Sequence, residues 1–589
     1  MDFHLVTAPF IEFIDTDRSN LALVFSPNLI NLEDRNPFDL SVHRQRLTNE
    51  DKRYIKYKVD KLRNRILPVL ASSLNTVHGV EFSSEYWEIL LGPWLHTSVN
   101  NTFLRLDSFQ LARKLGPISS MCLIDSLRSN QVAQDTTEFF ELILNLEWIN
   151  ARDWRISQYL DLEVSAKSIS LNLKSMQAGF VPHSSRSIAS VMKGHLQKIS
   201  VLSNKLNSGF FLATYMPSST EYKTQLLLGQ LPTANRSLSW KESTMIKKVD
   251  GDIRRRFTAN IRTAEFYGDD KFILTEVSEQ MPAVFLEHYN GVRRKCLKAL
   301  PKNPIFVFTS NSFHQDELFK FWIAEKKTTG TKYLIGQHGN NYGANDLTTP
   351  THEERTCSQF LTWGWRNPDS RYVPSIVFKT AGLKRNTRES GGLLLLSTNV
   401  PNGHSAWDES VEYYDQLKQQ HEFVDKLDEH VKSEITIRIP QLNSRIGDHM
   451  PNAWTKEPID FSLDLGVEPY LRVRSNYRLA VFSYDSTGLL EGLVSNVPTM
   501  AFWLDGLSHL NDFARAKYQI LVDAGIIFLN STDCSSKINE VWEDVGGWWK
   551  GKTIQEAREM FCANFCEYSN SPARDIAKSI KKAISHNHR

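Results

Sequence analysis

Short apolar runs alternate with amphipathic stretches along the last third of the chain, and this alternation constrains the fold more than any other feature. The runs are apolar at consecutive positions, so both faces of each predicted strand must be covered, as in a parallel sheet between helices. This pattern is typical of a Rossmann-like α/β unit. The predicted strands are LLLLST (393–398), EITIRIP (434–440), RLAVFSY (478–484), VPTMAFW (497–503) and GIIFL (525–529), with helices at about 410–432 and from 485–487 onward.

A second alternation precedes the first and predicts a second α/β domain. Its strands are PIFVFTS (304–310), KYLIGQHG (332–339) and QFLTWGW (359–365), with a helix at 316–327. We place the domain boundary near 366–391, which gives domains of 1–380 and 381–589. The N-terminal half is otherwise mostly helical by pattern. Helices are expected at 49–75, 133–150, 186–206 and 270–298, and again at 551–587.

Composition excludes several classes of protein. The 589 residues include 69 Lys and Arg against 67 Asp and Glu, a formal net charge of +2, whereas a dedicated nucleic-acid binder is far more basic. The six cysteines lack metal-ligand spacing and indicate reduced thiols in the cytoplasm. The N-terminus lacks the pattern of a secretory signal, and no apolar run approaches the roughly 20 residues of a membrane span. We expect a cytoplasmic globular protein without a nucleic-acid partner.

The segment SYDSTGLLEGLVSNVPT (483–499) is the most informative motif. Ser486 and Thr487 follow a predicted strand and open a helix, whose free N–H groups can bind phosphate. Gly488 permits close backbone approach, and Glu491 lies one turn further along the same face, where it can accept hydrogen bonds from ribose hydroxyls. An ordinary N-cap with an acidic first turn explains the same residues. Ligands sit at the carboxyl ends of strands in such sheets, which favours a nucleotide-donor site.

A second motif, GQHGNNYG (336–343), directly follows an apolar strand. His338 stands between glycines at the strand's carboxyl end, and its near-neutral pKa suits a general base or a phosphate contact. The alternative is a histidine that merely caps a glycine-rich turn. Gln337, Asn340 and Tyr342 are then expected to line the same cleft.

Two further groups of residues are candidates for a role in the site. In SSEYWEILLGPWL, Ser84 is a candidate N-cap, and Glu85 and Glu88 lie three residues apart on one helical face. These carboxylates suit acid–base chemistry or acceptor binding, but a solvated helix face explains them equally well. Arg438 and Arg445, at and beyond the end of a predicted strand, suit a phosphate or sugar carboxylate. Surface arginines are the alternative.

Other patterns are better explained without function. The Asp-x-Asp pattern, with which metal-dependent glycosyltransferases hold a divalent cation, occurs at Asp15-Thr16-Asp17 and Asp250-Gly251-Asp252. Neither match follows a convincing nucleotide-binding strand, so we expect no metal site. The basic segments near 52–65 and 578–589 suit an anionic membrane surface, although solvated amphipathic helices are the default explanation.

With these residues in hand, the chain resembles a family of transferases encoded in bacterial O-antigen and surface-polysaccharide gene clusters. The resemblance rests on EYWEILLGPWL (85–95), QHGNNYG (337–343) and DSTGLLEGLVSNVPT (485–499). More distantly, the C-terminal half is similar to GT-B glycosyltransferases, including those that transfer Kdo and related ulosonic acids. The resemblance implies two facing Rossmann-like domains without a metal, an acceptor-side N-terminal domain, and a C-terminal domain that binds the donor through Ser486, Thr487 and Glu491. It also implies that His338 faces the reacting centre.

We therefore expect a glycosyltransferase that needs no cofactor and moves a sugar from a nucleotide donor to a glycan or lipid-linked glycan acceptor. A CMP-activated ulosonic acid such as Kdo or a nonulosonic acid is the first expectation for the donor. The cytoplasmic face of the inner membrane is the expected location. In lipid A Kdo transferases a Gly-Gly-x-Gly-Glu loop supplies the catalytic base, and this chain has no clear counterpart of that loop. Glu85 is therefore a candidate base only by analogy of position. A sugar-nucleotide epimerase of the same fold and a non-catalytic polysaccharide-assembly protein are the alternatives.

Overall fold

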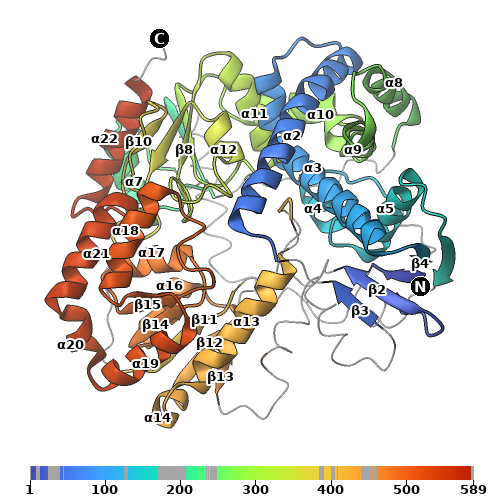
Figure 1. Cartoon of the computed structure of the whole chain (residues 1–589). Coiled ribbons are helices and arrows are strands. Elements are labelled where there is room, and N and C mark those ends of the chain that lie inside the picture. The colour runs from blue at the N-terminus through green and yellow to red at the C-terminus, as the bar shows by residue number, and fades with distance from the viewer. Residues whose placement is uncertain are drawn as a thin grey trace, which may run out of the picture.

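The computed structural model of the chain contains three parallel β-sheets with helices packed around them (Figure 1). It describes residues 2–7, 13–23, 40–43, 46–124, 131–169, 207–233, 235–236, 238, 249–383, 390–398, 405–407, 409–439, 454 and 461–585. The helix expected at 186–206 lies outside the described residues.

The N-terminal sheet has the strand order β3-β2-β1-β4-β5 and was not anticipated from the sequence. Its strands are β1 (Phe3–Val6), β2 (Ser19–Leu23), β3 (Leu40–His43), β4 (Ile118–Ile124) and β5 (Ser165–Ile169). β5 is SAKSI, and four of its five residues are exposed, so it lacks the apolar run that marks a strand in a buried sheet. The N-terminal half therefore contains a sheet of its own beside the expected helices.

Two long helices, α2 (Asn49–His78) and α3 (Ser84–Leu115), pack against each other and link this sheet to the rest. Thr48 and Asp51 form a capping box at the start of α2. The N-cap of α3 is Ser83, whose hydroxyl accepts the Tyr86 N–H, so the expectation that Ser84 is the cap was wrong by one residue. The neighbouring helices are α4 (Thr136–Leu142), α5 (Leu146–Tyr159), α8 (Gly251–Arg262), α9 (Gly268–Glu279), η4 (Ala283–Phe285) and α10 (Tyr289–Ala299).

The middle sheet has the order β10-β9-β8-β7-β6, with every pair parallel. Its strands are β6 (Gly209–Leu212), β7 (Phe306–Thr309), β8 (Lys332–Gly336), β9 (Gln359–Thr362) and β10 (Tyr372–Pro374). The associated helices are α7 (Ser218–Leu227), α11 (Glu317–Thr328) and α12 (His352–Thr356). All residues of β6, β7 and β9 are buried, in agreement with strands that are apolar on both faces.

The C-terminal sheet has the order β13-β12-β11-β14-β15-β16, also parallel throughout. Its strands are β11 (Leu393–Leu396), β12 (Ile435–Arg438), β13 (Ser462–Asp464), β14 (Leu479–Phe482), β15 (Thr499–Phe502) and β16 (Ile527–Phe528). Its helices are α13 (Ser410–Asp425), α14 (Glu429–Lys432), α16 (Tyr470–Val473), η5 (Arg474–Asn476), α17 (Thr487–Val494), α18 (Asp512–Asp523), α19 (Ser531–Val541), η6 (Trp542–Asp544), α20 (Val545–Lys550) and α21 (Lys552–Phe565). Five strands were predicted here, and all five are present.

The middle and C-terminal sheets confirm the expected α/β class. Because every strand pair is parallel, the carboxyl ends of the strands in each sheet share one edge, and the two edges meet where the loop after β8 contacts the start of α17. The middle and C-terminal sheets are separated in sequence between β10 and β11. The last helix, α22 (Pro572–Ser585), crosses back and packs on α7 and the middle sheet (Figure 1).

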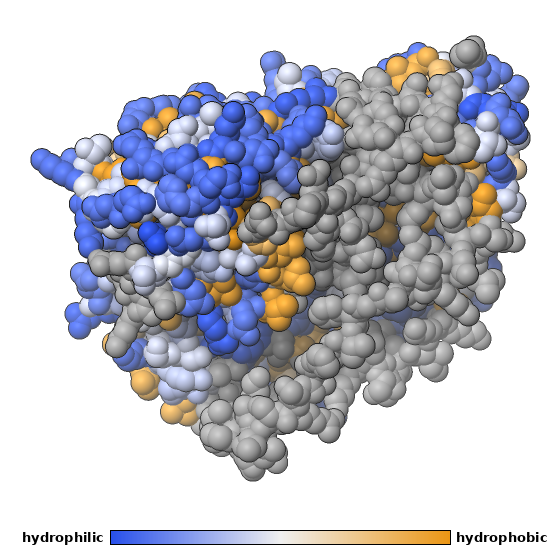
Figure 2. Space-filling model, turned by 90° about the horizontal axis from the view of Figure 1, so that it is seen from below, coloured by the Kyte–Doolittle hydropathy of each residue, from blue (hydrophilic) through white to orange (hydrophobic). Residues whose placement is uncertain are grey.

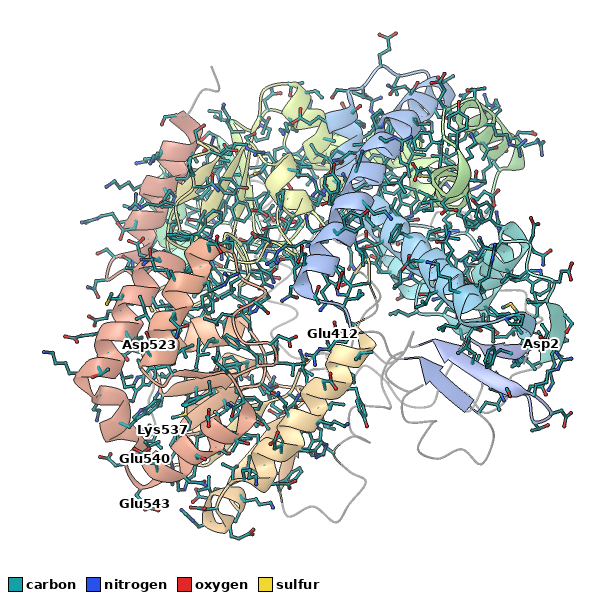
Figure 3. The ribbon with its side chains drawn as sticks, viewed as in Figure 1. Asp2, Glu412, Asp523, Lys537, Glu540 and Glu543 are labelled. Atoms are coloured by element: carbon teal, nitrogen blue, oxygen red, sulfur yellow. The ribbon has the colours of Figure 1, made fainter. Side chains whose placement is uncertain are left out.

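Most cations of the basic segment 52–65 have acidic partners inside the molecule. Lys52 Nζ lies 2.6 Å from Glu412 at the start of α13, which Figure 3 shows facing α2. Arg63 pairs with Glu88, and Arg65 pairs with Asp270. No helix among the described residues has the length and apolar character that crossing a bilayer requires. Seen from below, hydrophilic side chains cover much of the molecule's left part (Figure 2).

Candidate functional site

Three neighbouring strands of the middle sheet are each followed closely by a residue with an aromatic ring. Tyr215 follows β6, His314 follows β7 and His338 follows β8. The centroid of the His338 ring lies 6.1 Å from that of Tyr215 and 6.3 Å from that of His314. Because β6, β7 and β8 are adjacent and parallel, residues far apart in sequence meet at one edge of the sheet.

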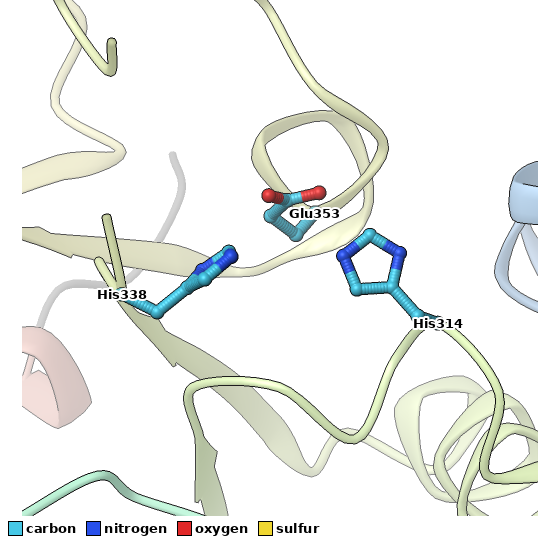
Figure 4. Close-up of side chains that lie close together, drawn as sticks. All are labelled: His314, His338 and Glu353. Atoms are coloured by element: carbon cyan, nitrogen blue, oxygen red, sulfur yellow. The ribbon is translucent and has the colours of Figure 1, made fainter. Parts of the chain in front are cut away.

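His338 belongs to a chain of hydrogen bonds that the sequence did not reveal. The Tyr342 hydroxyl donates to the buried Glu353 carboxylate on α12 and lies 3.0 Å from His338 Nδ1. Since the hydroxyl proton is directed to Glu353, Nδ1–H of His338 donates to the Tyr342 oxygen and Nε2 keeps its lone pair. Burial lowers the pKa of His338 to about 4, although the Glu353 carboxylate opposes the shift, so its imidazole is neutral near pH 7. The near-neutral pKa expected from the sequence was therefore wrong, and His338 is a weaker base than expected. Figure 4 shows His338, Glu353 and His314 pointing toward one another.

Two cavities adjoin at this chain. A larger cavity of about 650 Å³ lies between the middle sheet and the N-terminal helices, and its wall includes His314, His338 and Glu353. A smaller cavity of about 430 Å³ lies between the two later sheets and is lined by Asn340, Lys379 and Thr487 among others. His338 and Tyr342 line both cavities. A group at this position can therefore contact ligands on two sides.

The structure brings the two strongest sequence motifs into direct contact. The Asn340 backbone N–H donates to Thr487 Oγ1 over 3.1 Å, and the Thr487 hydroxyl donates to Asn340 Oδ1 over 3.2 Å. The Asn340 side-chain amide donates to the backbone oxygen of Asp485 over 2.7 Å. A Cβ at Gly339 would lie 3.0 Å from Thr487 Oγ1, so glycine allows this close approach. The loop after β8 is therefore held against the start of α17.

The start of α17 is a capped helix, as the sequence predicted. The Ser486 hydroxyl accepts the Gly488 N–H over 3.0 Å. Glu491, one turn further on, is buried, and its carboxylate lies 2.8 Å from Lys379 Nζ. Lys379 follows β10 and lines the smaller cavity, so Glu491 lies behind a cation of that cavity.

Other candidate donor-binding residues lie elsewhere or have partners. Arg438, the last residue of β12, pairs with Asp464 and donates to the backbone oxygen of Glu468 over 2.6 Å. Arg445 lies outside the described residues. Gln337 points into the turn, where its side-chain oxygen accepts the Trp363 N–H and the Trp365 indole N–H. It braces the loop after β8 and is not among the residues that line the two cavities.

Glu85 and Glu88 occupy different environments despite their spacing. Glu85 is 60% exposed, pairs with Lys327 and lines neither cavity. Glu88 is buried; burial opposes its ionisation, but His352, Arg63 and Arg355 together hold the pKa of its carboxyl well below the usual range. Glu88 therefore joins α3 to α2 and α12. The structure does not bring Glu85 together with His338.

The two Asp-x-Asp motifs have local roles in the structure. Asp15 accepts the Asp17 N–H within a turn, and Asp250 caps α8. Sequence reasoning instead missed His314, Glu353 and Lys379. His314 and Lys379 follow β7 and β10. The sequence signal that could have identified them is a polar residue shortly after a strand.

Comparisons with known proteins give a family and distant structural likenesses. A model of the LIC12162 family transferases matches residues 29–580. No curated protein sequence matches the chain. Among solved structures, UDP-GlcNAc 2-epimerase from Neisseria meningitidis bound to UDP-GlcNAc is 10% identical, with a TM-score of 0.34 and coverage of 64% of this chain and 99% of that one. MurG from Acinetobacter baumannii is 12% identical, with a TM-score of 0.29 and coverage of 64% and 100%. The S. aureus MnaA–UDP structure is 11% identical, with a TM-score of 0.34 and coverage of 63% and 95%.

Proposed function

The chain belongs to the LIC12162 family of transferases, and from this premise we propose that it is a glycosyltransferase that transfers a sugar from a nucleotide donor to a growing bacterial surface polysaccharide. One observation carries the proposal: two cavities adjoin at His338 and Tyr342. A transfer reaction must hold a donor and an acceptor side by side. An epimerase acting on a sugar nucleotide alone needs no second cavity for a glycan.

The smaller cavity is the proposed donor site. It lies at the carboxyl ends of strands from two sheets, where α/β proteins bind ligands, and it contains Lys379 and the first residue of α17, Thr487. A cation and a helix N-terminus both favour the phosphate of a nucleotide sugar. The same cation suits the carboxylate of a CMP-activated ulosonic acid, which is the donor we propose. Glu491 is buried behind Lys379 and does not line the cavity, so its proposed part is to set the position of the Lys379 ammonium and not to contact the ribose directly.

The larger cavity is the proposed acceptor site. Its wall combines polar side chains of α2, such as Lys56 and Asp60, with Trp407, a mixture suited to sugar hydroxyls and apolar ring faces. His338 lines both cavities, and in the tautomer derived above its Nε2 keeps a lone pair. We propose that it accepts the proton of the attacking hydroxyl.

The proposal includes a peripheral contact of α22 with anionic lipid. The exposed Lys578 and Lys581 on α22 support it, whereas the cations of α2 named above already have acidic partners. We expect cosedimentation with anionic liposomes to fall when both lysines are replaced by glutamine. Unchanged cosedimentation would argue against α22 as the contact.

Calorimetric titration with CMP, UDP and GDP sugars tests the donor assignment. We expect one nucleotide class to bind, with affinity lowered about tenfold in Glu491→Gln, because Lys379 loses its charged partner. The matched control is Glu540→Gln, which changes a carboxylate on the outer surface paired with Lys537 (Figure 3). Absence of binding by every nucleotide would favour the assembly-protein alternative. Release of a free sugar isomer from donor alone would favour the epimerase.

A further inference from the structure

We propose that His314, His338 and Glu353 bind one divalent transition-metal ion. A ligand atom from each side chain lies within 4.8 Å of those of the other two, and the three side chains converge in Figure 4. They come from three separate segments: the residues after β7, the residues after β8, and α12. The proposal rests on this arrangement of donor atoms around one point.

The donor set has the chemistry that such ions prefer. Two imidazoles and one carboxylate are typical ligands of Zn²⁺, Mn²⁺ and Fe²⁺. Metal–ligand bonds of about 2.0–2.2 Å place neighbouring donors about 3–3.5 Å apart. Rotations of side chains that already converge within 4.8 Å would close this difference.

A neighbouring hydroxyl holds two of the three proposed ligands. Tyr342 donates to the Glu353 carboxylate and lies 3.0 Å from His338 Nδ1. Metal-binding histidines and carboxylates are usually oriented by such outer hydrogen bonds, which fix the ring tautomer and raise ligand basicity. With Nδ1–H of His338 directed to the tyrosine, Nε2 is the atom left for an ion. An ion bound there would occupy the lone pair that the proposed function uses to accept a proton, so His338 can act as that base only in chains without the ion.

The open coordination positions would face a substrate cavity. All three residues line the larger cavity, and three protein ligands leave at least one position of a tetrahedral ion free. The ligand class for that position is an oxygen donor such as a hydroxyl, a carboxylate or a phosphate. The proposed site is not one of the two Asp-x-Asp motifs of the sequence. Its three ligands are separated by 24 and 15 residues and meet only in the folded chain.

Metal titration of the purified full-length chain tests the site without substrate. After removal of metal with a chelator, we expect calorimetry with Zn²⁺ or Mn²⁺ to show one equivalent bound. His314→Ala and Glu353→Gln should each weaken binding at least tenfold, and Tyr342→Phe about tenfold. Cobalt(II) should give ligand-field absorption bands that the His314→Ala variant loses. The matched control, His430→Gln, removes a half-exposed histidine of α14 and should bind metal like the unmodified chain.

Two results would overturn the proposal: no binding by the unmodified chain at about 100 μM metal, or equal binding by the unmodified chain, His314→Ala and Glu353→Gln. Circular dichroism checks that the variants fold, and His314→Gln serves if His314→Ala does not. The proposal does not depend on sugar transfer. A chain that binds metal but no nucleotide would contradict the proposed function and leave the metal site standing, and the reverse result would do the opposite.

Discussion

The carboxyl ends of the middle and C-terminal sheets are built alike but use their polar residues differently. At the middle sheet, His314, His338 and Glu353 point toward one another beside a cavity. At the C-terminal sheet, Thr487 and Glu491 contact Asn340 and Lys379 of the facing half. One edge therefore gathers reactive groups, whereas the other uses much of its polarity to hold the two halves together.

This difference shows how far the position of a residue after a strand predicts its function. The rule that ligands bind at the carboxyl ends of parallel strands locates both edges equally well. It does not say whether a polar side chain there faces a ligand or another part of the protein. Arg438 is an example, because it ends a strand as expected and yet pairs with Asp464.

Replacing His338 by alanine should give the largest effect and tests whether the middle-sheet edge carries the chemistry. We expect the rate of sugar transfer to fall at least 100-fold, the usual contribution of a general acid or base. Single-turnover assays with saturating donor measure the rate, and thermal unfolding checks that the fold is kept. A loss of less than about threefold would show that the reaction does not use this edge.

Glu221, on α7 after β6, should make stability depend on pH. Burial raises the pKa of its carboxyl from 4.5 to about 7, partly offset by Arg236. A folded-state pKa above the unfolded one contributes stability that is present below about pH 4.5 and is lost as pH rises through about 7. The free energy of unfolding should therefore fall by about 3 kcal/mol between pH 4.5 and 8 through this group.

Urea unfolding of the unmodified chain and Glu221→Gln at both pH values measures this term. The glutamine variant should lose less stability over the same range, because its side chain does not ionise. Parallel pH profiles for the two proteins would show that Glu221 makes no such contribution.

Thr487→Val tests whether the C-terminal edge holds the halves together. Valine keeps the shape of threonine but removes the hydroxyl that accepts the Asn340 N–H and donates to its side-chain oxygen. We expect a loss of about 1 kcal/mol in the free energy of unfolding, the usual size for such contacts. Urea unfolding measures it, and a stability equal to that of the unmodified chain would mean that this contact does not join the halves.

Glu85→Ala should have the smallest effect. The carboxylate is exposed and pairs with Lys327 at the surface, where ion pairs contribute little. We expect transfer activity and thermal stability to match those of the unmodified chain. A large loss of activity with an unchanged melting temperature would restore Glu85 as a candidate base and weaken the contrast between the two edges.

Much of the fold was predictable because its strands are apolar and their ends are marked by small polar residues. The strands at β7, β8, β9, β11, β12, β14, β15 and β16 all fall within predicted segments. The N-terminal sheet was not predicted, since an edge strand such as SAKSI has no hydrophobic run. Of the candidate site, the loop at His338 and the helix start at Thr487 were found from their motifs, but His314 and Glu353 belong to no local motif.

The sequence alone determined the α/β class, most strands of the middle and C-terminal sheets and the two loops at their edges, because hydrophobic periodicity and turn residues are local signals. Only the tertiary structure decided which polar groups meet. Adjacent parallel strands bring Tyr215, His314 and His338 together across more than a hundred residues of chain. Packing of the two sheet edges against each other then pairs Asn340 with Thr487 and Lys379 with Glu491. The spacing of these residues along the chain does not predict either contact.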